Sequence, residues 1–315
     1  MRWESNHAIR FGDTSVSKTK LRSAQYSINE YIKQLKGYSF ASRADMRHML
    51  NRCIKDLREL GFNLAHIKGL KPKHIHVLVE HWKTQNKNPA TIKNYMAKLR
   101  KISILLDKPK LVKPSNDAYK IARRSSIPTH NKAIYQVDFS KCTDPMIRLS
   151  LEAQSLFGLR REESMKLIIS EAWIGDSLRI KPSWTKGGIG RTLHITNNDQ
   201  QQWLIKANQQ VPSGRSLIPS SRTYKQHLSR YQIQTKQMGL SKCHGLRHAY
   251  AQRRYYEVTQ QFDPNKKGWL SPIAGGMPSK SLKAHQKNID HKTREIISRE
   301  LGHSRRSITK IYCGK

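Results

Sequence analysis

The sequence predicts a mainly α-helical protein in two parts, with a small β-hairpin in the second part. Apolar residues recur every three or four positions in four segments within the first 110 residues, which is the spacing of amphipathic helices. Two short β-type runs, 178–180 and 192–195, flank a glycine-rich stretch suited to a hairpin turn. With 315 residues, 37% of them hydrophobic, the chain has material for two domains of roughly 100 to 200 residues each.

The four helical segments are expected to pack as one compact bundle. The first, 18–36, is either a basic accessory arm or simply the first helix of the bundle. The second should be capped by Ser42 and end at Gly61. The third and fourth follow Pro72 and Pro89, because proline is favoured in the first turn of a helix.

Composition changes mark the expected domain boundaries. Between the bundle and the second part, apolar periodicity weakens while Pro, Ser and Lys accumulate, which is typical of a linker. The predicted divisions are 1–38 for the N-terminal arm or first helix, 39–112 for the bundle, 113–132 for the linker and 133–315 for the C-terminal domain.

The charge of the chain points to a polyanionic partner. Lys and Arg number 59 against 22 Asp and Glu, so the formal net charge is +37. Nucleic acid is the first interpretation and an anionic membrane surface the second. No apolar run reaches the ~18 residues of a membrane span, and the N-terminus lacks the apolar core of a signal peptide. We therefore expect a cytoplasmic protein, in the bacterial cytosol or nucleoid, without a membrane partner.

The fourth predicted helix carries a concentration of this charge. Such residues often form only a solvated face, but the net charge of the whole chain favours DNA contact. The candidate DNA-binding residues are Lys93, Lys98, Arg100 and Lys101.

Neither a cofactor nor a metal is expected. The four cysteines are scattered without a C-x-x-C pair, which argues against a disulfide framework and a cysteine zinc site. His244 and His248 are four residues apart, as in helical zinc motifs. Those motifs place a carboxylate between the histidines, whereas this chain has Gly-Leu-Arg, and a cation is a poor neighbour for a metal ion.

The C-terminal end suggests covalent catalysis by a tyrosine. His303 lies nine residues before Tyr312 in strongly basic surroundings. Because the free phenol has a pKa of about 10, a tyrosine acts as a nucleophile only where other groups favour its oxyanion. Candidate cations are Arg160, directly after a helix that breaks at Gly158, and Arg247, which shares a helical face with His244.

These residues together resemble the tyrosine recombinases, which include phage and mobile-element integrases. The resemblance runs from residue 158 to residue 312, and the helical bundle before it is similar in pattern to the family's core-binding domain. The matching motifs, in the family's order, are Gly158-Leu159-Arg160 with Glu163, the hairpin residue Lys186, His244 with Arg247, Leu301-Gly302-His303, and Tyr312.

The resemblance implies a mechanism and a role for each residue. Arg160 and Arg247 would bind the scissile phosphate, supported by Glu163, while Lys186 would protonate the departing 5′ oxygen. His244 would assist proton transfer at the tyrosine, and His303 would donate a hydrogen bond to the phosphate. Tyr312 would form a 3′-phosphotyrosine, so strand exchange would need neither metal nor ATP. The implied partners are double-stranded recombination sites, a tetramer of this chain on two duplexes, and accessory DNA-bending proteins.

Several alternatives stay open at the level of sequence. A type IB topoisomerase-like enzyme would use the same residues, and a non-catalytic DNA-binding protein would keep the scaffold. Arg161 stands beside Arg160, and Lys181 is a second candidate for the hairpin lysine. The stretch 252–294 is longer than the family pattern predicts; it either contacts a neighbouring protomer, through residues such as Trp269, or folds onto its own domain.

Overall fold

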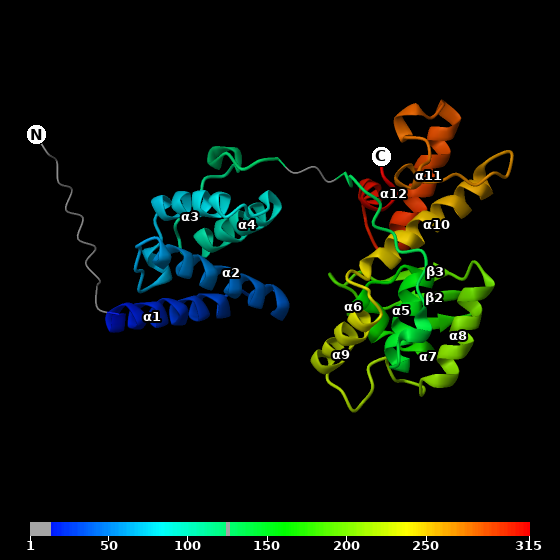
Figure 1. Cartoon of the computed structure of the whole chain (residues 1–315), viewed down its shortest axis with the longest axis horizontal. Coiled ribbons are helices and arrows are strands. Elements are labelled where there is room, and N and C mark those ends of the chain that lie inside the picture. The colour runs from blue at the N-terminus through cyan, green and yellow to red at the C-terminus, as the bar shows by residue number, and fades with distance from the viewer. Residues whose placement is uncertain (1–13, 124–126) are drawn as a thin grey trace, which may run out of the picture. The chain divides into compact units, whose positions relative to one another are not determined.

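The chain folds as two compact units, Met1–Arg124 and Ser125–Lys315 (Figure 1). This computed structural model describes residues 14–123 and 127–315, so the start of the predicted N-terminal arm lies outside the described residues. Within those two ranges, no helix combines the length and apolar content needed to cross a bilayer. The N-terminal unit contains α1 (Thr14–Lys33), α2 (Phe40–Glu59), α3 (Pro72–Thr84) and α4 (Pro89–Leu105).

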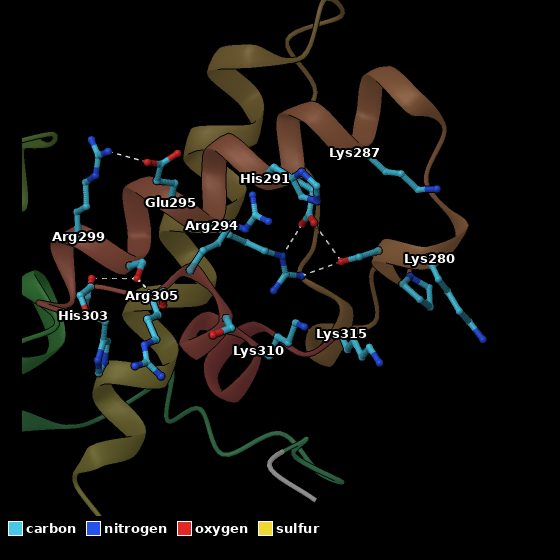
Figure 2. Close-up of a pocket in the computed structure, with 17 residues that line it drawn as sticks. Lys280, Lys287, His291, Arg294, Glu295, Arg299, His303, Arg305, Lys310 and Lys315 are labelled. Atoms are coloured by element: carbon cyan, nitrogen blue, oxygen red, sulfur yellow. Dashed lines mark hydrogen bonds and ion pairs between the residues drawn. The ribbon is translucent and has the colours of Figure 1, made fainter.

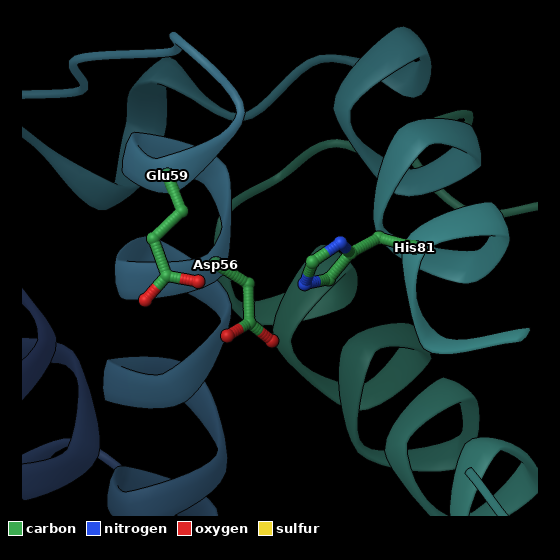
Figure 3. Close-up of side chains that lie close together, drawn as sticks. All are labelled: Asp56, Glu59 and His81. Carbon is green, nitrogen blue, oxygen red and sulfur yellow. The ribbon is translucent and has the colours of Figure 1, made fainter. Parts of the chain in front are cut away.

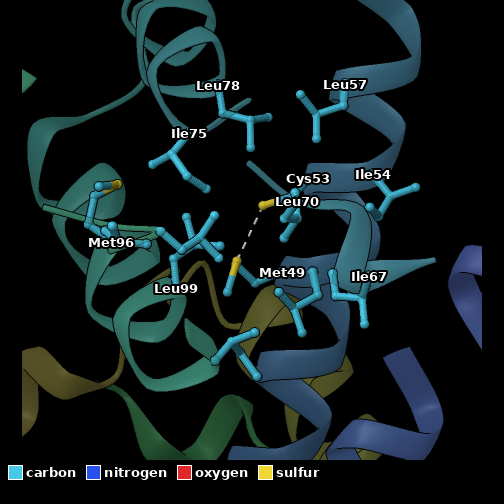
Figure 4. Packing of buried hydrophobic residues seen from close by; sticks show 14 of the residues in the cluster. Met49, Cys53, Ile54, Leu57, Ile67, Leu70, Ile75, Leu78, Met96 and Leu99 are labelled. Atoms are coloured by element: carbon cyan, nitrogen blue, oxygen red, sulfur yellow. Dashed lines mark hydrogen bonds between the residues drawn. The ribbon is translucent and has the colours of Figure 1, made fainter. Parts of the chain in front are cut away.

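The apolar faces of these four helices form one core. Figure 4 shows side chains of α2, α3 and α4 meeting around Cys53, whose thiol lies 3.4 Å from the Met49 sulfur. Ala24 and Ile28 of α1 are fully buried in the same core. Of the two interpretations of the first segment, the structure therefore favours a helix of the bundle over an accessory arm.

The cap of α2 differs from the expected one. The helix begins at Phe40, and the Ser39 hydroxyl accepts a hydrogen bond from the Ser42 backbone N–H at 3.2 Å. Ser39 is therefore the N-cap, and the assignment of that role to Ser42 was wrong by three residues. The Asp45 carboxylate, three residues after Ser42, pairs with Lys98 of α4 at 2.7 Å.

Part of the expected linker belongs to the bundle. Tyr119 and Ile121 are 3% and 4% exposed and lie in the core of the N-terminal unit. The Tyr119 hydroxyl also accepts a hydrogen bond from the Lys113 backbone N–H. Two apolar side chains thus anchor the stretch 113–123, so the linker is shorter than the predicted 113–132.

The C-terminal unit combines helices with a three-stranded antiparallel sheet in the order β1-β2-β3. Leu178 of β2 pairs with Leu193 of β3, and both are buried, while the intervening residues Arg179 and Thr192 face outward. This alternation is the reason that the two runs form a half-buried hairpin. The elements are α5 (Pro145–Phe157), α6 (Arg161–Lys166), α7 (Ile169–Ala172), β1 (Trp173–Ile174), β2 (Ser177–Ile180), β3 (Arg191–His194), α8 (Asn198–Gln210), α9 (Tyr224–Gln237), α10 (His244–Phe262), α11 (Ala284–Glu300) and α12 (Lys310–Cys313).

The unexplained stretch 252–294 consists of the end of α10, a connecting segment and most of α11. The Trp269 indole N–H donates to the Asp263 carboxylate at 2.8 Å, and its ring packs against the core formed by α10, α11 and α12. Leu270 and Met277 remain 56% and 55% exposed. The segment therefore folds onto its own domain at Trp269, and only its exposed apolar residues remain available to a partner.

Candidate active site

The tyrosine of α12 lies at the meeting point of three segments. Tyr312 is only 4% exposed. Its hydroxyl oxygen accepts a hydrogen bond from Arg247 Nε at 3.3 Å and lies 3.4 Å from His303 Nε2. Three residues that are spread over 65 positions of the sequence thus converge on one oxygen atom.

Arg247 is a buried cation that several hydrogen bonds fix in this site. It lies in the first turn of α10 and is 1% exposed. One terminal nitrogen donates to the Gly158 carbonyl at the end of α5, and the other donates to the Leu301 carbonyl at the end of α11. Its second terminal nitrogen also lies 3.4 Å from His303 Nε2. Since a guanidinium has five N–H groups, these contacts and the bond to Tyr312 leave one for a ligand. Burial lowers the pKa of Arg247 to about 10, so it stays charged at neutral pH.

Glycine is required at the end of α5. Gly158 has a φ of +61°, and a Cβ there would lie 2.4 Å from the Tyr250 ring. A side chain would therefore be strained by the backbone conformation and would collide with Tyr250. Because the Gly158 carbonyl binds Arg247, this glycine also helps to orient the guanidinium.

Arg160 and Glu163 form a tight pair at the start of α6. Arg160 Nη1 lies 2.6 Å from Glu163 Oε1, and the Arg160 backbone N–H donates to Oε2 at 2.9 Å. The Glu163 side chain is fully buried, whereas that of Arg160 is 25% exposed. Arg160 can therefore face a ligand while Glu163 holds it from behind.

Arg191 is a site residue that the sequence did not single out. Its guanidinium binds both carboxylate oxygens of Glu163, at 3.2 and 2.7 Å. Burial alone would raise the pKa of Glu163, but the hydrogen bonds and charge of Arg191, together with Arg160, lower it to about 2. The available signal was weak, since Arg191 is one basic residue among many and its contact depends on the sheet register.

Two histidines of α10 complete the surroundings of the tyrosine. The ring centroids of His248 and His244 lie 4.8 and 5.9 Å from that of Tyr312. Burial and the nearby positive charges lower the pKa of His244, and burial and His244 lower that of His248 to about 4. Burial and Arg247 likewise lower the pKa of His303 to about 4. All three imidazoles are therefore neutral at pH 7.

Lys186 lies in the hairpin turn at the edge of a cleft shared with other predicted residues. It is exposed in the turn between β2 and β3, at a cleft of about 520 Å³ that Arg160 and His244 also line. The alternative, Lys181, pairs with Glu171 at 2.6 Å. The structure thus brings Lys186 to the cleft of Arg160 without a direct contact to Tyr312.

Two family models match the chain. One describes the N-terminal domain of phage integrases and matches residues 25–112, and the other describes integrases and matches residues 120–253. The chain belongs to the tyrosine recombinase family. Both models describe integrases, which favours site-specific DNA cleavage and rejoining over the topoisomerase-like and non-catalytic alternatives. No curated protein sequence matches this recombinase.

Solved structures show the same fold. A fragment of lambda integrase, as a dimer bound to a COC′ core site, has 16% identity and a TM-score of 0.57, and the match covers 91% of this chain and 94% of that one. A lambda integrase tetramer on a Holliday junction has 14% identity and a TM-score of 0.54, with 96% and 84% covered. The Tn1549 transposon integrase with transposon right end DNA has 10% identity and a TM-score of 0.54, with 92% and 94% covered.

The two adjacent arginines of the recombinase point to different neighbours. Arg160 is bound to Glu163, as described above. Arg161 is exposed, and its guanidinium carbon lies 6.0 Å from the centre of the Tyr231 ring of α9. Both residues line the same cleft, but only Arg160 is held by the buried carboxylate.

The four candidate DNA-binding residues of α4 fall into two groups. Lys98 pairs with Asp45, and Arg100 donates to the Lys113 carbonyl at 2.9 Å, so both hold the bundle together. Lys101 is exposed beside the Tyr38 ring, and Lys93 is partly exposed. Lys93 and Lys101 are therefore the two that can bind DNA without losing an ion pair or a backbone hydrogen bond.

A cluster in the N-terminal unit has the composition of a metal site. Asp56, Glu59 and His81 bring their oxygen and nitrogen atoms within 4.8 Å of one another (Figure 3). However, the Asp56 carboxylate accepts from Trp82 Nε1 at 2.8 Å and from Arg52 Nε at 2.7 Å. These donors satisfy the buried carboxylate. We therefore assign the cluster to helix packing.

The buried histidines make the stability of the recombinase depend on pH. An unfolded histidine has a pKa near 6.5, above the value of about 4 for His248 in the fold. The unfolded state therefore binds a proton more tightly, and its advantage grows as the pH falls from 6.5 to 4. This makes the free energy of unfolding decrease with falling pH. We expect His248→Phe, which keeps a ring, to reduce this decrease by about 1 kcal/mol per pH unit. Thermal unfolding at pH 4.5, 5.5 and 7 tests this, and parallel pH profiles for both proteins would contradict it.

Proposed function

We propose that this chain catalyses site-specific DNA recombination through a covalent phosphotyrosine at Tyr312. One observation carries the proposal: the Tyr312 oxygen lies against Arg247 Nε and His303 Nε2 in a single folded chain. A cation beside this oxygen stabilises the negative charge that develops as it attacks phosphorus. Because all the residues come from one chain, each protomer would cleave with its own tyrosine.

The proposed cleavage step assigns a task to each side chain. Arg160 and Arg247 bind the non-bridging oxygens of the scissile phosphate and stabilise the added charge of the pentacoordinate transition state. Tyr312 forms the bond to phosphorus as the bond to the 5′ oxygen breaks. Lys186 supplies the proton that the 5′ oxygen takes. Rejoining reverses these steps with a 5′ hydroxyl from another strand, so no external energy source is consumed.

The phenol proton needs an acceptor, and geometry favours one histidine. The ring centroids of His244 and His303 lie at similar distances from that of Tyr312, 5.9 and 6.0 Å. Only His303 has a ring nitrogen within hydrogen-bond distance of the Tyr312 oxygen among the described residues, at 3.4 Å, although the resemblance assigns this transfer to His244. Both are neutral near pH 7 and can accept a proton. We propose that His303 takes the proton first and, once charged, donates a hydrogen bond to the phosphate.

A cationic cleft beside the site offers a surface for the flanking DNA. It has a volume of about 960 Å³ and contains His303 of the active site (Figure 2). Of its two acidic residues, Asp290 is bound by Arg294 and Glu295 by Arg299. Within the described part of the chain, the remaining cations of the cleft form no ion pairs; they are Lys280, Lys287, Arg305, Arg306, Lys310 and Lys315.

These cations support double-stranded DNA as the partner, in line with the net charge of +37. We further propose that four protomers assemble on two duplexes in the cytoplasm. The lambda integrase tetramer on a Holliday junction, which shares this fold, supports such an assembly. Exposed Leu270 and Met277 are candidate contact residues.

The experiment that tests the function is covalent trapping. Duplexes tiled from the DNA that flanks the gene, each with a nick next to the candidate cleavage position, let the short cleaved end diffuse away. We expect a protein–DNA adduct that survives denaturation and maps to Tyr312 by mass spectrometry. Exchange of strands between two labelled duplexes distinguishes recombination from topoisomerase-like resealing. If no tiled duplex yields an adduct, the proposal fails.

Salt dependence tests the DNA-binding surfaces. We expect the affinity for a cleaved duplex to fall by at least about 10³-fold between 50 and 200 mM salt, because bound phosphates release counterions. Lys93→Gln should reduce the log–log slope by about one. The control is Lys98→Gln, which should lower the melting temperature through the loss of Asp45 and change the slope less. If the log–log slope for Lys93→Gln equals that of the wild type, Lys93 does not contact the DNA.

A further inference from the structure

Arg191 joins three parts of the active site. It is the first residue of β3, in the hairpin that carries Lys186, and its side chain is 6% exposed. Its terminal nitrogens bind both oxygens of Glu163. Its Nε donates to the Glu300 carbonyl at 2.6 Å, three residues before His303. The hairpin, the start of α6 and the end of α11 therefore meet at one guanidinium.

The backbone next to His303 leaves room for this contact. Gly302 has a φ of +64°, and a Cβ there would approach Arg191 Nη1 to 3.1 Å. A side chain at this position would press on the guanidinium as well as strain the backbone. The Leu-Gly-His sequence thus allows the segment of His303 to pack directly against Arg191.

The shared carboxylate determines the charge of the phosphate site. Glu163 Oε1 accepts from Arg160 at 2.6 Å and from Arg191 at 3.2 Å. Arg160 and Glu163 alone would be a neutral pair, with the arginine directed at its carboxylate. Two guanidinium groups on one carboxylate leave a net charge of +1. Because Arg191 is buried and Arg160 is partly exposed, this positive charge is available at Arg160.

We propose that Arg191 is a positioning residue of the strand-cleavage reaction, which holds and neutralises Glu163 so that Arg160 can bind the scissile phosphate. The proposal rests on the function proposed above. Arg191 itself touches no substrate. It acts through Glu163 on Arg160. Through its bond to the Glu300 carbonyl it also holds the segment of His303 in place next to Arg160 and Glu163.

Substitution of Arg191 should slow cleavage without weakening binding. For Arg191→Met, which keeps length but loses charge and donors, we expect single-turnover cleavage of a nicked suicide duplex to slow about 100-fold, as misplaced catalytic groups do. Affinity for the same duplex should change less than about threefold. The control is Arg222→Met, which removes a partner of the buried Asp144 away from the tyrosine and should cleave at nearly the wild-type rate.

A substrate with a 5′-bridging sulfur separates this role from action through Lys186. Sulfur leaves as a thiolate without needing a proton, so Lys186→Ala should recover most of its activity on this substrate. Arg191→Met should stay slow, because its defect lies at Arg160. Rescue of Arg191→Met to the same extent as Lys186→Ala would overturn the proposal in favour of an effect on the hairpin lysine.

The pH profile gives an independent readout. In the wild type, Glu163 stays ionised across pH 5 to 8, since its pKa is about 2. Loss of Arg191 raises that pKa, so Glu163 of Arg191→Met takes up a proton more readily as the pH decreases from 8 to 5. Protonation removes the negative charge that otherwise cancels that of Arg160, so the rate difference between Arg191→Met and the wild type should become smaller as the pH decreases. If the wild type cleaves and Arg191→Met cleaves equally fast, the role proposed for Arg191 is refuted while the proposed function stands. No cleavage by the wild type would refute the proposed function itself.

Discussion

Tyr312→Phe is expected to abolish covalent capture of nicked DNA while leaving DNA binding intact. The change removes one oxygen and little volume, so the buried ring keeps its packing against His248. No other hydroxyl in the described residues accepts a hydrogen bond from Arg247. Loss of a nucleophile of this kind slows catalysis by at least about 10⁴-fold. Denaturing gels of suicide-substrate reactions measure adduct formation, and gel shifts measure affinity; a persistent adduct would reject Tyr312 as the nucleophile.

Mixing experiments extend this test to the origin of the tyrosine. Since Tyr312 and Arg247 are hydrogen-bonded within one chain, Tyr312→Phe and Arg247→Lys should not restore each other's cleavage activity when combined. Restored cleavage in the mixture would mean that a protomer receives its tyrosine from a neighbour in the DNA complex. Conformational change on DNA binding would then have replaced the contact that the isolated chain shows.

Local patterns were sufficient to predict most of the helices. Periodic apolar positions report which face of a helix is buried, and this signal needs no knowledge of the partner helix. The second strand run was placed to within one residue, because β3 begins at Arg191. The resemblance named Arg247, His303 and Tyr312 together, and the structure brings them within 3.4 Å of one oxygen atom, while their catalytic roles stay a prediction.

The features that were missed all depend on contacts between distant segments. Arg191 binds Glu163 only because the sheet register and the end of α11 place it there. Tyr119 and Ile121 lie in a polar, proline-containing stretch, where two isolated apolar residues give no periodic signal. Lys98 belongs to a basic face by sequence, yet Asp45 of another helix holds it. In each case the partner, rather than the residue itself, decides the role.

Arg160→Lys is expected to slow cleavage by about 10²- to 10³-fold, the cost of losing a donor to transition-state charge. A lysine keeps the charge but cannot contact Glu163 and a phosphate oxygen with a planar set of donors. Arg161→Lys should cleave within about threefold of wild type, because Arg161 lies on the exposed side against Tyr231 and is not held by Glu163.

The comparison between these two variants decides which arginine binds the phosphate. They change the same chemical group at neighbouring positions, so effects on net charge are the same in both, and thermal unfolding of each variant measures any difference in stability. Single-turnover rates at saturating DNA isolate the chemical step from binding. If Arg161→Lys proves the slower enzyme, the phosphate must enter the 520 Å³ cleft from the side of α9, and Arg160 then serves only to anchor Glu163.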